Sequence, residues 1–374
     1  MRIGIDLLWV RPGICGGTES FIRNLLDGFK EFDRENEYFL FAARDNEGTF
    51  RHYEESGHMS IIVCNVNCNS QPRRILWENI FLDRMARRER IDVMFIPVYS
   101  MPRTHGSRIP YVCTIHDVQA LHYPQYFSLV KRLFLKQAWH YTCRRAGRVV
   151  TGSAYCEKDL LTFYPAAKGR TEIIYDVVAS RKSSLDFGSI QAKYGLRQGQ
   201  YDYCVSSMLP HKNLTTLLRA VELRRRQEKT CTLVLSGVGG RHEDFDAEVE
   251  KLNIGDLIVD TGFVSDEERD CLYDHCRLFL FPSIFEGFGM PPIEAMRRGK
   301  RVVMTRESCL EEVTQGKAVY VDSPYDAADW SQKMDIALEK AAETQRFERY
   351  EPKNVAAEYI KVFNSLSAER SGAT

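Results

Sequence analysis

The chain of 374 residues lacks several features that would place it in a protein class at once. Its formal net charge is zero, so no overall positive field points to a nucleic-acid partner. No apolar run reaches the length of about 18 residues that a membrane-spanning helix needs. No signal peptide precedes the strand-like start MRIGIDLLW. These absences predict a water-soluble protein whose membrane contact, if any, is peripheral.

Metal-binding and redox patterns are also missing. The 11 cysteines are scattered, with no Cys-x-x-Cys pair and no Cys/His spacing suited to zinc. No DxD pair of carboxylates stands out as a clamp for Mg²⁺ or Mn²⁺, so we expect no metal. Because no GxGxxG follows the first strand, an NAD-dependent oxidoreductase is disfavoured. Scattered thiols suit a reducing, cytoplasmic location.

Length and composition favour two globular domains. The chain is 44% hydrophobic and 27% charged, which is typical of globular proteins. Its length suits two domains of about 150–200 residues each. Alternating strand and helix patterns predict an α/β fold. We place a first domain in residues 1–177, a linker in 178–199, a second domain in 200–350, and a final amphipathic helix and tail in 351–374.

The most informative stretch is FLFPSIFEGFGMPPIEAMRRGKRVV, residues 279–303. A short buried strand runs into an acidic turn with two glycines, which contains Glu286, and a proline pair then starts a helix. We place Glu294 in the first turn of that helix. The N–H groups and dipole of a helix N-terminus favour phosphate, and carboxylates suit sugar or ribose hydroxyls. The alternative is that both acids are simply solvated.

Other candidate residues follow predicted strands. Gly16 and Gly17 lie between the first strand and a helix, where backbone N–H groups can hold phosphate, although such a pair is usually only a turn. His116 and Asp117 end another strand at a sheet's carboxyl edge, where α/β proteins bind ligands, although a lone histidine is more often structural. Lys212 precedes a helix and can meet a diphosphate as a movable charge, although such a lysine is normally solvated.

Positive charge gathers in the first half. Residues 73–148 contain 14 Lys and Arg against 5 Asp and Glu. Two predicted helices, 73–90 and 128–145, carry many of these charges. In the first, we expect apolar residues on one side and arginines on the other; the second mixes basic with large apolar residues. One interpretation is solvated surface, and the other is contact with anionic lipids.

The pattern FPSxFEGFGxPPxEAMxxGxxVV, with its Glu-x7-Glu spacing, resembles the donor-binding motif of family 4 retaining glycosyltransferases. The resemblance covers nearly the whole chain, from Gly16 and Gly17 through His116 to Lys212 and the acidic turn. It implies the GT-B fold: two Rossmann-like β/α/β domains that face each other across a cleft, with a C-terminal helix that crosses back to the first domain.

The resemblance implies a donor site in the second domain. Glu286 is expected to hold sugar hydroxyls near the anomeric centre, Glu294 the ribose diol, and Lys212 the diphosphate. The other donor-binding residues implied there are Ser207, Gly262, Phe263, Val264, Gly287, Phe288 and Gly289. Many relatives carry an arginine where this chain has Ser207, so one cation is missing, which we interpret as variation within the family.

The resemblance implies that residues of the first domain contribute to both the donor site and the acceptor site. Gly16 and Gly17 are expected against the donor diphosphate, and Gly17, His116 and Asp117 near the acceptor. His116 would approach the transferred sugar, with Asp117 as its orienter or as a structural hydrogen-bonding group. The implied catalytic set is therefore His116, Lys212 and Glu286, without a metal or cofactor.

The implied activity is transfer of a hexose from a nucleotide-diphosphate sugar, with retention of anomeric configuration and with the leaving phosphate helping to take the acceptor's proton. GDP-mannose is the first expectation, while UDP- and dTDP-sugars stay open. The expected acceptor is a saccharide linked to a lipid diphosphate, of the kind used in O-antigen or capsule assembly. The expected location is the cytoplasm, including the cytoplasmic face of the inner membrane. A nucleotide-sugar epimerase or a non-catalytic sugar-nucleotide-binding protein of the same fold stays an alternative.

Overall fold

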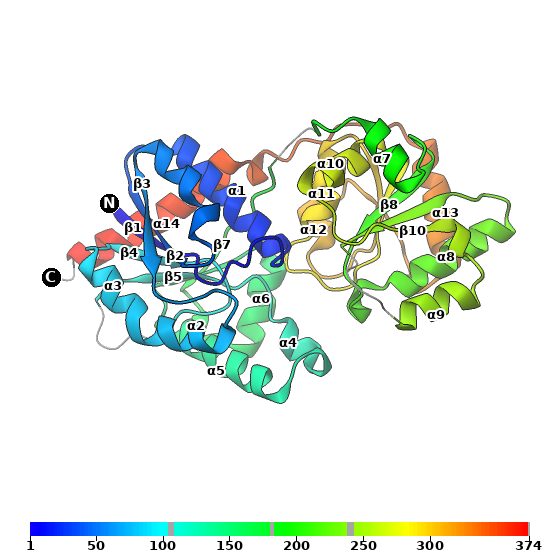
Figure 1. Ribbon diagram of the computed structural model, residues 1–374. Coiled ribbons are helices and arrows are strands. Elements are labelled where there is room, and N and C mark those ends of the chain that lie inside the picture. The colour runs from blue at the N-terminus through cyan, green and yellow to red at the C-terminus, as the bar shows by residue number, and fades with distance from the viewer. Residues whose placement is uncertain (104–107, 180–182, 238–242, 373–374) are drawn as a thin grey trace. The chain divides into compact units, whose positions relative to one another are not determined.

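The computed structural model describes residues 1–103, 108–179, 183–237 and 243–372, which fold into two compact units (Figure 1). The first unit contains Met1–Val178 and Glu348–Thr374, and the second contains Ala179–Phe347. Most of the stretch expected as a linker, residues 178–199, therefore counts with the second unit. Its residues 180–182 lie outside the described ranges.

The first unit is built on seven parallel strands in the order β3-β2-β1-β4-β5-β6-β7. Their bounds are β1 (Arg2–Asp6), β2 (Glu37–Ala43), β3 (Met59–Cys64), β4 (Val93–Ile96), β5 (Tyr111–Thr114), β6 (Arg148–Thr151) and β7 (Thr171–Ile173). The strand order reverses between β1 and β4. In an open parallel sheet, ligands bind at the carboxyl edge beside such a reversal.

Helices cover both faces of this sheet (Figure 1). One core cluster joins the sheet to α1 (Gly17–Phe32) and α14 (Pro352–Gly372). In α1, Phe21, Leu25 and Phe29 recur at helical spacing and are fully buried. A second cluster lies on the opposite face. The other helices of this unit are α2 (Gln71–Trp77), α3 (Asp83–Arg88), α4 (Gln119–His122), α5 (Leu129–Arg145) and α6 (Ala154–Phe163).

The C-terminal helix α14 returns to the first unit, as the sequence predicts. Its Tyr359 ring lies 5.0 Å from Phe95 of β4 and 6.5 Å from Phe29 of α1, measured between ring centroids. The Tyr359 hydroxyl lies 3.1 Å from the Thr114 hydroxyl of β5. The last stretch of the chain is therefore part of the first unit's core.

The second unit has six parallel strands in the order β10-β9-β8-β11-β12-β13. Their bounds are β8 (Tyr201–Val205), β9 (Thr232–Ser236), β10 (Ile258–Asp260), β11 (Leu278–Phe281), β12 (Arg301–Met304) and β13 (Val319–Tyr320). All four residues of β11 are buried, in agreement with its apolar sequence LFLF. The order reverses between β8 and β11.

Seven helices accompany this sheet in the described part of the second unit: α7 (Phe187–Tyr194), α8 (Leu214–Arg226), α9 (Glu243–Lys251), α10 (Asp266–His275), α11 (Met290–Arg297), α12 (Leu310–Thr314) and α13 (Ala327–Glu339). Ser265 starts α10 with a capping box, in which its hydroxyl accepts from the Glu268 N–H and the Glu268 carboxylate accepts from the Ser265 N–H. Helix α7, from the expected linker, packs on α10.

The chain also forms short helical turns between these elements. The 3₁₀ turns are η1 (Glu47–Thr49), η2 (Arg51–Ser56), η4 (Pro124–Tyr126), η5 (Pro165–Ala167), η6 (Pro210–Lys212), η7 (Gly255–Leu257) and η8 (Glu348–Tyr350). In the described ranges, no helix is both long and apolar enough to cross a bilayer.

The helix expected over residues 73–90 has an unexpected interior. A π-helical segment, η3 (Glu78–Leu82), separates α2 from α3. A wider π turn rotates the side chains that follow it relative to a regular α-helix. The apolar side expected on this helix is also largely exposed, because Leu76 has 61% of its surface accessible and Ile80 43%.

Candidate functional site

In the second unit, Lys212 and Glu286 form a half-buried ion pair. Lys212 ends η6 and precedes α8, while Glu286 follows β11. The Lys212 Nζ donates to Glu286 Oε1 at 2.7 Å, and the two side chains are only 18% and 15% exposed. The structure thus brings together the lysine expected on the diphosphate and the carboxylate expected on the sugar. Water is partly excluded there, which strengthens their electrostatic interaction.

A glycine fixes the turn between Glu286 and α11. Gly289 has φ +84°, in the left-handed region, and a Cβ there would lie 2.7 Å from a methyl carbon of Leu310. Only glycine fits both conditions. The helix begins at Met290, one residue before the proline pair, with Gly289 as its N-cap. Glu294 is therefore the fifth residue of α11, and our placement of it in the first turn is wrong.

The neighbouring loop holds the backbone of the acidic turn. The Glu286 N–H donates to the Ser308 hydroxyl at 3.1 Å. The Cys309 thiol donates to the carbonyl oxygens of Glu286 and Phe288, at 3.3 Å each. The Phe288 side chain is buried in the core, so only its backbone can face a ligand. Sequence reasoning missed Ser308 and Cys309, which lie on the connection after β12.

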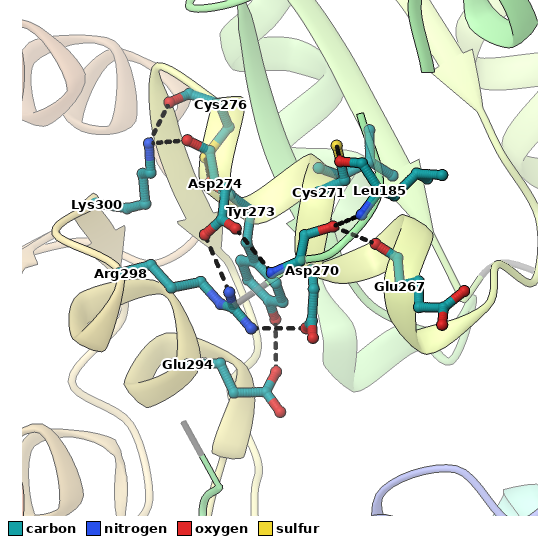
Figure 2. Close-up of polar contacts among 12 residues, drawn as sticks. Leu185, Glu267, Asp270, Cys271, Tyr273, Asp274, Cys276, Glu294, Arg298 and Lys300 are labelled. Carbon is teal, nitrogen blue, oxygen red and sulfur yellow. Dashed lines mark hydrogen bonds and ion pairs between the residues drawn. The ribbon is translucent and has the colours of Figure 1, made fainter. Parts of the chain in front are cut away.

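Glu294 is held by a tyrosine from another helix. The Tyr273 hydroxyl, on α10, donates to Glu294 Oε2 at 2.9 Å (Figure 2). Burial lowers the pKa of Arg269, but the charge of Glu294 and other acids nearby raises it more. The Glu294 carboxylate therefore lies near a fixed hydroxyl and a guanidinium. Neither Tyr273 nor Arg269 belongs to the motif from which Glu294 was predicted.

The segment expected at the nucleotide base follows β10. The Gly262 N–H donates to Asp260 Oδ1 at 2.8 Å, and the Gly262 carbonyl accepts from the Gly237 N–H at 2.9 Å. The next ring, Phe263, is 76% exposed. An exposed apolar ring at a strand end could stack on a base, because every base presents a π face. Val264 is half-buried.

The lysine site contains less positive charge than its sequence suggests. His211 precedes Lys212 and is buried; burial, followed by the charge of Lys212, lowers the pKa of its imidazole to about 3. His211 is thus neutral at physiological pH. Ser207, in the loop after β8, is half-buried and carries no charge. Neither side chain supplies the cation that the resemblance places at Ser207.

In the first unit, Gly16 and Gly17 expose backbone at the start of α1. Gly16 is the N-cap, with φ 59°, and both residues are exposed. Glu19, in the first turn of the helix, accepts from the Gly13 N–H at 2.9 Å and pairs with Arg23 at 2.8 Å. The loop before α1 is therefore held by a side chain of its own helix. This leaves the helix N-terminus at the carboxyl edge of β1.

His116 follows β5 and contacts protein groups through both ring nitrogens. Its Nε2 lies 3.1 Å from the Pro97 carbonyl oxygen, and its Nδ1 lies 3.5 Å from Asp176 Oδ1. Because a carbonyl can only accept, we assign a hydrogen to Nε2. The Phe21 ring packs edge-on against the imidazole, with centroids 4.8 Å apart. Because both ring nitrogens face protein acceptors, this geometry suits a fixed imidazole better than a general base.

Asp176 is the main cause of a raised pKa at His116. Burial lowers the pKa of His116, but the charge and hydrogen bond of Asp176, with a smaller contribution from Asp117, raise it above its ordinary value. Asp117 itself accepts from the Gln119 N–H at 2.8 Å, which starts α4. The sequence leaves two roles for Asp117, and this contact is the structural one. Asp176, the partner of Nδ1, was missed.

A second acidic cluster, also missed, lies at the end of β1. Burial raises the pKa of Asp6 to about 6, against the Leu8 N–H and the charge of Arg74. Burial and the charge of Asp6 raise the pKa of Glu78 to about 8, although Arg74 Nη1 donates to Glu78 Oε1 at 2.6 Å. The sequence signals that could have revealed this cluster are an aspartate in the first predicted strand and a glutamate within the predicted helix 73–90.

Metal ligands do not gather in the part of the chain that the structure describes: no three His, Cys, Asp or Glu side chains lie together as a metal site would need. The expectation of metal-independent chemistry rests on the sequence and stays a prediction.

Known families match both halves of the chain. Residues 15–180 match the family described as Glycosyltransferase Family 4, and residues 188–354 match the family described as Glycosyl transferases group 1. Together the two matches leave only the ends and a short stretch near the boundary of the two units uncovered.

Two similar proteins are named O-antigen chain mannosyltransferases. The O-antigen chain mannosyltransferase B of Escherichia coli is 30% identical over 220 residues, which are 58% of this chain and 58% of that protein. The O-antigen chain mannosyltransferase RfbU of Salmonella typhimurium is 25% identical over 237 residues, 63% of each chain. The chain thus aligns with somewhat more than half the length of these relatives.

A solved structure with the same fold is that of Anabaena HepE in complex with UDP and glucose. The two chains cover each other fully, with a TM-score of 0.67 and 17% identity. At this identity the likeness shows the fold alone, and it agrees with two parallel sheets flanked by helices.

Proposed function

Because the chain belongs to the family 4 glycosyltransferases with the GT-B fold, we propose that it transfers a hexose from a nucleotide-diphosphate sugar to a saccharide acceptor. The observation that carries this proposal is the pairing of Lys212 with Glu286 beside the glycine turn that starts α11. A cation, a carboxylate and a helix N-terminus in one place suit a diphosphate joined to a sugar.

The chemistry asks little of the protein beyond charge and position. The bond between the anomeric carbon and the donor phosphate oxygen breaks, and the acceptor oxygen bonds to that carbon from the same face. The acceptor's proton passes to the leaving phosphate oxygen. Lys212 and the N–H groups around Gly287 and Gly289 stabilise the negative charge that develops there. Glu286 holds sugar hydroxyls, and no metal takes part.

In the first unit, we assign the acceptor side to Gly17, His116 and Asp117. His116 acts there as a fixed ring that packs edge-on against Phe21, since its nitrogens face Pro97 and Asp176. The donor proposal is GDP-mannose, supported by the two O-antigen mannosyltransferases among the relatives. UDP- and dTDP-sugars are the competing donors.

Substitution of the ion pair tests the proposal. Lys212→Ala and Glu286→Ala should each lower transfer from GDP-mannose to a lipid-linked saccharide by about tenfold to a thousandfold, the range for losing a charge-stabilising or positioning group. Lys333→Ala is the matched control, because Lys333 is also 18% exposed and paired at 2.7 Å, with Asp322, in the same unit. Turnover by radiolabelled donor and the anomeric configuration by NMR are the measurements.

Each outcome of that assay is informative. Parent-like transfer in both variants, with the fold intact by circular dichroism, would reject the assignment of the site. An inverted product would reject the retaining mechanism, and loss of transfer with EDTA would reject metal independence. Conversion of the donor without any acceptor would instead support the epimerase alternative, and donor binding without turnover the non-catalytic one.

We also propose that the first unit contacts an anionic membrane, on the cytoplasmic face of the inner membrane. The first turns of α5 expose Val130 at 79% and Leu133 at 54%, together with Lys131 and Arg132. Leu76, on α2, is exposed as well. Apolar and basic side chains mixed on one surface suit the interface of a bilayer that contains anionic lipids. A lipid-linked acceptor would be met there.

A further inference from the structure

Tyr273 is rigidly buried in the second unit. Its ring, on α10, is inaccessible to solvent. It packs against Tyr203 of β8 and Phe279 of β11, with ring centroids 5.2 Å away in both cases. An aromatic side chain has only two side-chain torsions, and packing on two strands fixes both. The position of the Tyr273 hydroxyl is therefore determined by the sheet.

Ion pairs lock α10 to the end of α11. Figure 2 shows the Arg298 guanidinium between two carboxylates of α10: it lies 2.7 Å from Asp270 and 3.0 Å from Asp274. The same guanidinium lies 5.6 Å from the centre of the Tyr273 ring. Lys300 Nζ donates to the Asp274 carbonyl at 2.6 Å. Helix α11, which carries Glu294, therefore cannot shift relative to the tyrosine without breaking these contacts.

The direction of the hydrogen bond is also determined. Burial raises the pKa of Tyr273 well above its ordinary value, and the charge of Glu294 raises it further. The hydroxyl therefore keeps its proton and donates it to Glu294 Oε2. A carboxylate accepts at up to about four lone-pair sites, so this donor leaves Oε1 and part of Oε2 for a ligand. Two neighbouring hydroxyls are the ligand groups that match.

The geometry points to Tyr273 as a positioning residue that aims Glu294 at the vicinal diol of a ribose, and so makes the donor site select ribonucleotides over deoxyribonucleotides. This inference rests on the proposed function, which assigns the ribose to Glu294. It adds a residue 21 positions before Glu294, on a different helix, and a specificity that the motif alone does not give. Arg269 lies near enough for the charge of Glu294 to raise the pKa of its guanidinium.

If Tyr273 had only a structural role, its substitution would weaken the binding of ribonucleotides and deoxyribonucleotides equally. The test therefore compares the two classes of ligand. Dissociation constants for GDP, UDP, 2′-deoxy-GDP and 2′-deoxy-UDP are measured by titration calorimetry on the full chain. We expect the parent to favour the ribonucleotide by about tenfold, as for one hydrogen bond to a charged group. Tyr273→Phe should weaken ribonucleotide binding by about tenfold, leave the deoxynucleotides nearly unchanged, and bring the ratio close to one.

Tyr203→Phe is the matched control. Tyr203 belongs to the same aromatic cluster, but its hydroxyl donates to Ser236 Oγ at 3.0 Å, and Ser236 keeps the Thr261 hydroxyl as a partner at 2.7 Å. This variant should keep the parent's ratio. If it lost the ratio as fully as Tyr273→Phe does, general loosening of the cluster would be the cause and the inference would fall.

Glu294→Gln separates the inference from the proposed function. If Glu294→Gln loses the ratio and Tyr273→Phe keeps it, the positioning role is wrong while the ribose site stands. If Glu294→Gln also keeps the parent's ratio, or the parent binds neither GDP nor UDP, the assignment of Glu294 falls and the inference falls with it. A double variant no worse than Glu294→Gln alone would support a single pathway through the carboxylate.

Discussion

At the scale of single residues, the pKa of His116 depends mainly on Asp176, which lies beside it in the fold but far from it in the sequence. Burial lowers the pKa of this imidazole, and the nearby charge of Asp176 outweighs that effect. Because the pKa of His116 is raised above its ordinary value of about 6.5, the pair stabilises the fold at pH below that value. The contribution is lost as the pH rises through the raised pKa.

Asp176→Asn should lower the pKa of His116 to below the parent's value, because burial then acts with less opposition. Ring-proton NMR titration measures it, with His116→Gln assigning the resonance among nine histidines. Asp159→Asn is the control: Asp159 lies 2.8 Å from His122 Nε2 in the same unit and should leave the His116 titration unchanged. An unchanged His116 titration in Asp176→Asn would contradict the role of Asp176.

The sequence allows candidate site residues to be proposed where the chemistry is local in sequence. Lys212, Glu286 and Glu294 lie in short motifs, and the structure pairs the first two directly. Their partners were not predictable, because contacts such as that of His116 with Asp176 join residues that lie far apart in the chain. Only the packing of strands and helices brings such pairs together. Sequence patterns identify reactive groups more readily than the groups that hold them.

At the scale of elements, apolar periodicity identified the strands but not their ends. β1 stops at Asp6, whereas the apolar run continues to Trp9, because Asp6 Oδ1 accepts from the Leu8 N–H and turns the chain. The π-helical segment η3 could not be predicted from the sequence either, since its residues would also suit an α-helix. Helix α11 starts one residue earlier than expected, because Gly289 adopts a left-handed conformation and serves as its N-cap. Local backbone conformation decided all three.

Helix α5 carries the membrane proposal, and its first turns test it. The double variant Val130→Asp/Leu133→Asp should reduce co-sedimentation with phosphatidylglycerol-containing vesicles by about tenfold or more, because two exposed apolar contacts become anionic. Tyr325→Asp is the control, since Tyr325 is 66% exposed in the second unit. Weak binding of the parent to the same vesicles, or equal binding to pure phosphatidylcholine, would argue against the proposal.

At the scale of the whole molecule, buried acids and histidines make stability depend on pH in opposite ways. In the first unit, the pKa values of Asp6 and Glu78 are raised, to about 6 and about 8. Such acids bind more protons when folded, so their contribution falls as the pH rises from about 4 to 8. In the second unit, the lowered pKa of His211 acts in reverse: its contribution grows with pH until the unfolded imidazole is neutral.

Glu78→Gln isolates the first of these effects, because the second unit contributes equally to parent and variant. Gln keeps an acceptor for Arg74 and removes the acid that ionises between pH 5 and 8. The parent's free energy of unfolding should therefore fall over this range by on the order of 1–3 kcal/mol more than the variant's. Urea unfolding at several pH values, followed by tryptophan fluorescence, measures the difference. Parallel pH profiles for the two proteins would show that Glu78 ionises alike in the folded and unfolded chains.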